Sequence, residues 1–157
     1  MTGARTWAQL ALGILAWLAV VPAAEAINCR VQIAAMNFGT YMPLQAAPLD
    51  VNGGVTIRCQ AQAGSFTVTL GAGLSGEASN RTMISPGGGV LNYNLYADPA
   101  RTLVWGDGTG ATATVSGVRE VKGRPVFFDY AVYGRVFPDQ APPPGSYTDT
   151  ILVTVLF

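Results

Sequence analysis

The stretch GSYTDTILVTVLF, residues 145–157, decides the fold class of this chain. In an extended backbone its side chains alternate between two faces. One face carries Ile151, Val153, Val155 and Phe157, and the other carries threonines and leucines. Apolar groups on both faces predict a strand that is buried on both sides, inside a β-sandwich. An apolar strand at a sheet edge also invites pairing, so either its own fold or another chain is expected to cover it.

The preceding sequence repeats the same kind of pattern. Strands are expected at residues 28–36, 55–60, 66–70, 90–97, 112–118 and 126–136. Asn52, Gly53 and Gly54 predict a turn, and Ala63-Gly64 predicts a hairpin between the second and third of these strands. Residues 71–89 are expected to be irregular. Because no segment has a helical period, the chain is predicted to be an all-β sandwich.

The N-terminal part has the features of a secretory signal peptide. One arginine precedes an apolar run at residues 10–21, and small residues at Ala24 and Ala26 fit a cleavage site. We expect residues 1–26 to be the leader, with cleavage after Ala26, and residues 27–157 to form one domain. The apolar run is short for a membrane span, and no other long apolar stretch follows, so no membrane anchor is expected.

The two cysteines and the low charge narrow the class of protein. In an exported chain, Cys29 and Cys59 are most simply explained by a disulfide. A metal site is disfavoured, since the spacing is wrong and the sequence contains no histidine. Charged residues make up 11% of the chain and the net charge is zero, so no nucleic acid partner is expected.

The sequence offers little catalytic chemistry. Without histidine the commonest general base is missing, and Lys122, the only lysine, lies in a predicted turn. We therefore expect no enzyme, no catalytic residues and no cofactor. The carboxylates that might pair are Asp98, Asp107, Asp129 and Asp149. Aromatic side chains leave a sugar-binding surface as an alternative: Tyr93, Tyr96, Trp105, Phe127, Phe128, Tyr130 and Tyr133.

A series of landmarks then resembles a known family. In chain order they are Cys29, Phe38-Gly39-x-Tyr41, Cys59, Arg81-x-Met83, Leu91-x-Tyr93-x-Leu95-Tyr96-x-Asp98, Trp105-Gly106, Gly145-x-Tyr147-x-Asp149 and Phe157. Their order and spacing are similar to those of the spore coat protein U domain family, which includes pilin subunits of archaic, Csu-type chaperone–usher pili. The resemblance covers essentially all of residues 27–157.

The resemblance implies an immunoglobulin-like sandwich that lacks its final strand. It implies a Cys29–Cys59 disulfide and a strand-acceptor groove whose edge is formed by Ile151, Val153, Val155 and Phe157, with the chain-end carboxylate as an anchor for a chaperone. The implied partners are a periplasmic pilus chaperone, an outer-membrane usher and neighbouring pilin subunits, and the implied location is a fimbria at the cell surface. Such a groove would be filled by strand addition from a partner.

The predicted leader bears on whether this subunit can donate a strand as well as accept one. A subunit that donates a strand needs an extension before its first cysteine, whereas cleavage after Ala26 leaves only Ile27 and Asn28. We therefore expect a tip or other terminal subunit, involved in surface attachment and biofilm formation. Two alternatives stay open: a secreted spore or cell-surface coat protein, and a secreted carbohydrate-binding module.

Overall fold

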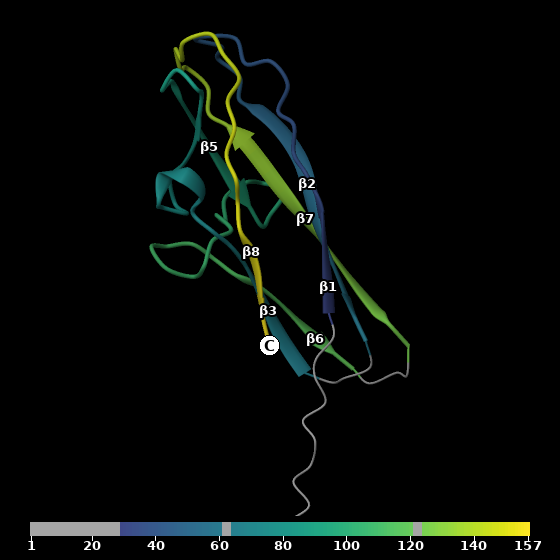
Figure 1. The fold of residues 1–157 in the computed structure, drawn as a ribbon. Coiled ribbons are helices and arrows are strands. Elements are labelled where there is room, and N and C mark those ends of the chain that lie inside the picture. The colour runs from purple at the N-terminus through teal and green to yellow at the C-terminus, as the bar shows by residue number, and fades with distance from the viewer. Residues whose placement is uncertain (1–28, 61–63, 121–123) are drawn as a thin grey trace, which may run out of the picture.

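The computed structural model describes residues 29–60, 64–120 and 124–157, and the predicted leader lies outside them. The described chain forms eight strands and one short 3-10 turn, with no α-helix (Figure 1). In chain order the elements are β1 (Cys29–Ala34), β2 (Leu49–Cys59), β3 (Gly64–Leu70), η1 (Gly73–Ser75), β4 (Arg81–Ile84), β5 (Val90–Tyr96), β6 (Val115–Arg119), β7 (Val126–Val136) and β8 (Val153–Leu156).

The strands form two antiparallel sheets. A five-stranded sheet has the order β1-β2-β7-β5-β4, and a three-stranded sheet has the order β6-β3-β8. The longest pairing joins β2 to β7 over their whole lengths, from Leu49↔Val136 to Cys59↔Val126. The predicted all-β sandwich is confirmed, and the prediction for residues 126–136 matches β7 in both bounds.

The core lies between the two sheets and follows the alternation of the sequence. The five-stranded sheet contributes alternate residues of its central strands, such as Val55 and Ile57 on β2 and Leu91 and Leu95 on β5. From the other sheet, Phe66, Val68 and Leu70 of β3 face them, each at most 2% exposed. Since side chains on one strand face alternate, these buried sets fix the register of both sheets.

The turn predicted at residues 52–54 is wrong. Asn52, Gly53 and Gly54 lie inside β2, where Gly53 pairs with Val132 of β7. A Cβ atom on Gly53 would collide with the side chain of Met36 and the carbonyl of Ala34. The glycine therefore permits the close approach of the segment that follows β1. Close approach of another segment is one common reason for a glycine within a strand.

The hairpin predicted around Ala63-Gly64 is also wrong. β2 pairs with β1 and β7, whereas β3 pairs with β6 and β8 in the other sheet. β2 and β3 therefore lie in different sheets. The section expected to be irregular, residues 71–89, contains a further strand, β4, which pairs with β5.

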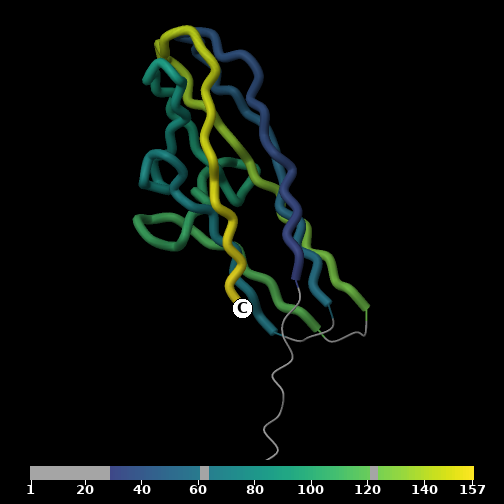
Figure 2. The backbone as a smooth tube through the Cα atoms, viewed as in Figure 1, coloured from purple at the N-terminus to yellow at the C-terminus, as the bar shows by residue number. Residues whose placement is uncertain are grey.

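The last stretch differs from its prediction in burial. Val153 and Val155 face the core, but Leu152 and Leu156 are 72% and 57% exposed, so the strand is covered on one face only. The stretch also changes sheets (Figure 2). Thr148 and Ile84 of β4 exchange two backbone hydrogen bonds, and β8 then pairs with β3 from Val153↔Leu70 to Leu156↔Thr67. We call residues 148–156 the C-terminal strap.

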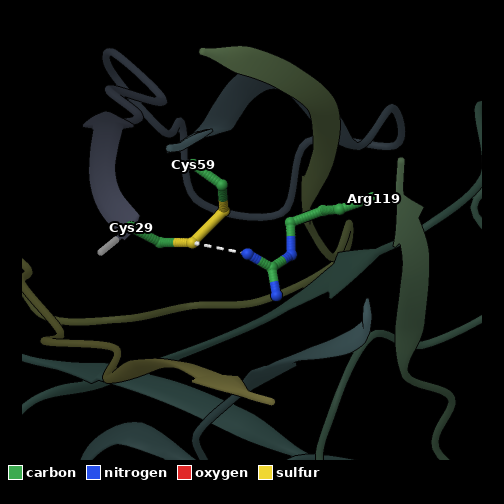
Figure 3. Close-up of a disulfide and its surroundings, with 3 residues drawn as sticks. All are labelled: Cys29, Cys59 and Arg119. Carbon is green, nitrogen blue, oxygen red and sulfur yellow. Dashed lines mark hydrogen bonds between the residues drawn. A yellow bond between two sulfur atoms is a disulfide. The ribbon is translucent and has the colours of Figure 1, made fainter. Parts of the chain in front are cut away.

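The predicted disulfide is present. Cys29 and Cys59 are joined, and they are direct partners in the register of β1 and β2 (Figure 3). β1 has no other strand neighbour among the described residues, so the disulfide ties an edge strand to the sheet. Nowhere in residues 29–60, 64–120 and 124–157 is there a helix long and apolar enough to span a membrane.

Candidate functional site

Two strand edges lack partners and face one space. β1 ends the five-stranded sheet and β8 ends the three-stranded sheet, and in the described chain neither has a second neighbour. In Figure 1 the two strands run along the same side of the molecule. A sheet of three strands covers only part of a sheet of five. A groove is therefore left beside β8, over the inner face of the larger sheet.

The exposure of β1 shows that this inner face is open. Val31 pairs with Ile57, and Ile33 pairs with Val55, so each pair points its side chains to the same face. Ile57 and Val55 are 0% and 1% exposed, whereas Val31 and Ile33 are 41% and 54% exposed. Apolar side chains on the core-facing side of an edge strand are thus left in solvent, because nothing in the described chain lies over them.

A cavity of about 390 Å³ marks the centre of this groove. Its walls come from both sheets and are mainly apolar. The lining residues are Ile33, Ala34, Ala35, Met36, Phe38, Gly54, Val55, Leu70, Met83, Tyr93, Leu95, Val132, Tyr147, Thr148, Asp149, Thr150, Ile151 and Val153. A second cavity, of about 680 Å³, adjoins it and shares Met36, Phe38, Met83, Tyr147 and Thr148. We call the space between β1 and β8, with the first cavity at its centre, the edge groove.

The four predicted groove residues are distributed along one wall. Ile151 and Val153 line the cavity directly. Val155 does not line it but packs against the core beside it. Phe157 lies beyond β8, is 54% exposed, and places its ring 6.3 Å from that of Phe66. The wall on the β1 side, including Ile33 and Met36, was missed, because the sequence pattern does not reveal which strands become neighbours across a gap.

Asp149 fixes the beginning of the strap against β5 and η1. Its carboxylate accepts hydrogen bonds from the Tyr93 hydroxyl at 2.7 Å and from the backbone N–H of Leu74 at 2.9 Å. Burial raises the pKa of the Tyr93 hydroxyl, and the hydrogen bond to Asp149 raises it further, so the phenol stays neutral and donates. The groove wall is therefore held by a defined polar contact and not by apolar packing alone.

Arg81 holds the two sheets together beside the groove. Its side chain is fully buried, and its guanidinium donates to the carbonyl oxygens of Leu70, Gly71 and Trp105 and to Oδ1 of Asn94, at 2.8–3.0 Å. Burial lowers the pKa of Arg81, but these acceptors satisfy the cation. Arg81 thus links β4 and β5 of one sheet to the end of β3 in the other.

Comparison with known proteins identifies the family. Residues 15–154 match the family model described as the Spore Coat Protein U domain. The chain belongs to the spore coat protein U domain family. This spore coat protein U domain is 31% identical to "Protein U" of Myxococcus xanthus over 134 residues, which is 78% of the chain and 71% of that protein.

A solved structure shows the same fold. It is the CsuC–CsuE complex of a chaperone and a tip adhesion subunit, from archaic chaperone–usher Csu pili of Acinetobacter baumannii. The TM-score is 0.57 with 24% identity, over 84% of the present chain but only 40% of the matched chain. The spore coat protein U domain thus spans less than half of that chain, and the likeness establishes the immunoglobulin-like sandwich.

The structure buries three of the seven aromatic side chains named for the sugar-binding alternative. In this spore coat protein U domain Trp105 is 0% exposed, and its Nε1–H donates to the carbonyl of Val68. Tyr93 and Tyr96 are also buried, and the rings of Phe66, Tyr130 and Trp105 pack edge to face. The aromatics proposed to bind a sugar therefore include three that belong to the packed interior, and an exposed Trp105 platform is excluded.

The predicted polar candidates are dispersed. Asp98 and Asp107 accept hydrogen bonds from their own loops, at Thr102 and Thr109, as turn-forming carboxylates do. Asp129 accepts from the Thr56 hydroxyl on the outer face of the five-stranded sheet, whereas Asp149 lines the cavity of the edge groove. Within the described ranges no three His, Cys, Asp or Glu side chains gather in a way that could hold a metal ion.

Proposed function

We propose that this chain is a structural or adhesive subunit of a chaperone–usher surface fimbria, assembled by donor-strand complementation. The observation that carries the proposal is the exposure of Val31 and Ile33 on the core-facing side of β1. The edge groove would accept one extended strand from a partner, completing a sandwich that lacks its final strand. The match to a solved complex of a chaperone and a tip adhesion subunit supports this assignment.

Strand addition suits the geometry of the groove. A strand laid beside β8 would pair with the backbone groups on its free edge, while alternate side chains would enter the cavity lined by Ile151 and Val153. Backbone hydrogen bonds would supply affinity for any extended segment, and the cavity would select apolar side chains at every second position. Val155 and Phe157 would continue the same wall toward the chain end.

The partners follow from this mechanism. A periplasmic pilus chaperone would fill the groove during export, an outer-membrane usher would receive the complex, and a neighbouring pilin subunit would then replace the chaperone. The chaperone would hold the chain-end carboxylate as an anchor. The subunit would be exported through the periplasm to a fimbria at the cell surface, where it would serve in surface attachment and biofilm formation.

The position in the fibre depends on the leader. With cleavage after Ala26, two residues would precede Cys29, too few for a donated strand, so we propose a tip or other terminal subunit. N-terminal sequencing of the exported protein tests the cleavage site. A subunit of this kind should not polymerise with itself, and self-assembly of the purified protein into fibres would refute the terminal position.

A secreted coat protein is the second candidate. The identity with "Protein U" over 71% of that protein, together with the description of the family, favours it. The two candidates differ in what the lone domain does. A fimbrial subunit with an open groove should aggregate unless a chaperone or a strand covers it, whereas a self-sufficient coat protein should fold alone as a stable monomer.

The deciding experiment is co-expression with the periplasmic chaperone of the same organism. We expect a one-to-one complex for the wild type and at least tenfold less complex for Val153→Asp, because a carboxylate would be placed in the apolar cavity. Leu152→Asp is the matched control: Leu152 directly precedes Val153, is 72% exposed on the other face, and its replacement should leave the yield unchanged. Equal yields for the two variants would contradict the groove as the binding site.

A further inference from the structure

Arg119 occupies the end of the edge groove. It is the last residue of β6 and is 2% exposed. Its Nη1 lies 3.8 Å from Sγ of Cys29, where β1 begins (Figure 3). Its guanidinium carbon lies 5.2 Å from the centre of the Phe157 ring, just beyond the end of β8. The guanidinium therefore sits between the ends of the two strands that border the groove.

Two of the three guanidinium nitrogens of Arg119 have no acceptor. Nε and Nη2 are buried and make no hydrogen bond. Buried donors are almost always satisfied, so an orphaned pair calls for an explanation. The other fully buried arginine, Arg81, shows how this fold treats such a group, since each of its nitrogens has at least one oxygen acceptor. The acceptor for Arg119 is thus absent from the described chain.

The orphaned atoms identify the missing chemistry. Nε and Nη2 form the side of the guanidinium that binds both oxygens of a carboxylate. Arg135 does this in the same molecule, with Nε and Nη2 donating to the two oxygens of Asp50 at 2.8 and 2.7 Å. In Arg119 the same two donors are buried without an oxygen acceptor in the described chain, and the ring of the half-exposed Phe157 lies over the guanidinium. A carboxylate would give each donor its own oxygen, whereas a single carbonyl oxygen would have to be shared, as the Gly71 oxygen is shared by Nε and Nη2 of Arg81.

We propose that Arg119 binds an Asp or Glu side chain of the extended segment that fills the edge groove. The inference rests on the proposed function, because the groove must accept a strand for its end to receive a side chain. Arg119 would add a polar contact to a groove that otherwise recognises its strand through apolar side chains. The cavity selects apolar residues along the strand, and Arg119 sets the register by selecting one acidic residue near Cys29 and Phe157.

The test uses synthetic peptides about a dozen residues long, built of alternating valine and threonine, as strand mimics. One glutamate is moved along the apolar face in steps of two residues, and each peptide has a glutamine counterpart. Binding to the exported chain is measured by fluorescence anisotropy. At one position near the end of the peptide, we expect glutamate to bind about tenfold more tightly than glutamine.

Variants then assign the effect to Arg119. Arg119→Gln should abolish the preference for glutamate, and Arg119→Lys should keep part of it, since lysine retains the charge but not the paired donors. Arg30→Gln, at an exposed arginine nearby, should retain the full preference. If Arg119→Gln does not fold, the wild type and Arg119→Lys still decide the matter.

The outcomes separate this inference from the function on which it rests. Peptide binding without a preference at any position leaves water as the acceptor and overturns the role of Arg119 alone. A preference that survives in Arg119→Gln overturns it as well. Failure of all peptides to bind, with Val153→Asp behaving as wild type, overturns the strand-acceptor groove and the Arg119 site with it.

Discussion

Removal of the disulfide should loosen one wall of the edge groove. The perturbation is the double variant Cys29→Ala/Cys59→Ala. β1 pairs only with β2 in the described chain, and the bond joins the first register pair, Cys29↔Cys59. No further strand backs β1, so the bond is its main covalent restraint against separation from the sheet.

The size of the effect follows from the loop that the bond closes. The cysteines are separated by 30 residues. In the chain-entropy model this corresponds to about 12 cal/mol/K, or about 3.6 kcal/mol at 25 °C. With a urea m-value of about 1.5–2 kcal/mol/M, the unfolding midpoint should fall by about 2 M.

The assay compares oxidised and reduced protein in urea, with the groove covered by the chaperone or a strand peptide. Wild type should lose about 3–4 kcal/mol on reduction, and the double variant should show no difference between the two conditions. Hydrogen exchange should accelerate in β1 far more than in the central strands β5 and β7. A loss below about 1 kcal/mol, or equal acceleration in all strands, would refute the view that the bond acts on β1.

The remaining predictions concern the buried and exposed arginines and their partners. Arg81→Met should lower the free energy of unfolding by about 3–5 kcal/mol, because four buried or part-buried oxygens lose the hydrogen bonds that Arg81 donates. Arg135→Met, which removes a partly exposed pair with Asp50, should cost less than about 1 kcal/mol in the same urea titration, and similar losses would contradict the argument. The hydrogen bond from Arg135 holds the pKa of Asp50 below its ordinary value, so the pair stabilises the fold above about pH 4 and this contribution is lost as the pH falls through the folded pKa. The stability advantage of wild type over Asp50→Asn should therefore shrink in acid, and an advantage that grows below pH 4 would show the opposite linkage.

Alternation in the sequence predicted the strands whose neighbours lie on both sides. Leu91, Tyr93 and Leu95 alternate and are all buried, and the bounds of β7 were predicted without error. Alternation predicts these strands because a central strand turns one face to the core, and the strands on either side of it turn the same face to that core. The export signal and the single pair of cysteines predicted the disulfide, which alternation alone does not specify, and the family resemblance implied the same pairing.

The errors arise where distant contacts override local signals. Gly53 resembles a turn residue, yet it lies in β2 because Met36 needs the space of its missing side chain. Nothing local to Phe66 or Val68 says that their strand joins the opposite sheet. The exposed faces of Leu152 and Leu156 have the same composition as buried ones, so burial on both sides was a reasonable but wrong expectation.

The sequence predicted one of the two walls of the edge groove. The wall formed by Ile151 and Val153 follows from the apolar C-terminal stretch. The opposite wall, at Ile33 and Met36, depends on which strand lies across the gap, and that is decided by the order of the whole sheet. Arg119 could not be found from sequence at all, because its significance lies in acceptors that are missing around it.

The C-terminal strap also has a mechanical consequence. Four register pairs join β8 to β3, and two hydrogen bonds join Thr148 to Ile84 of β4. A pull along the chain end loads the pairs of β8 together in shear, and the force then passes through Thr148 to the other sheet. In a fibre of such subunits, tension would be divided between the two layers of each domain and would not fall on a single strand pair.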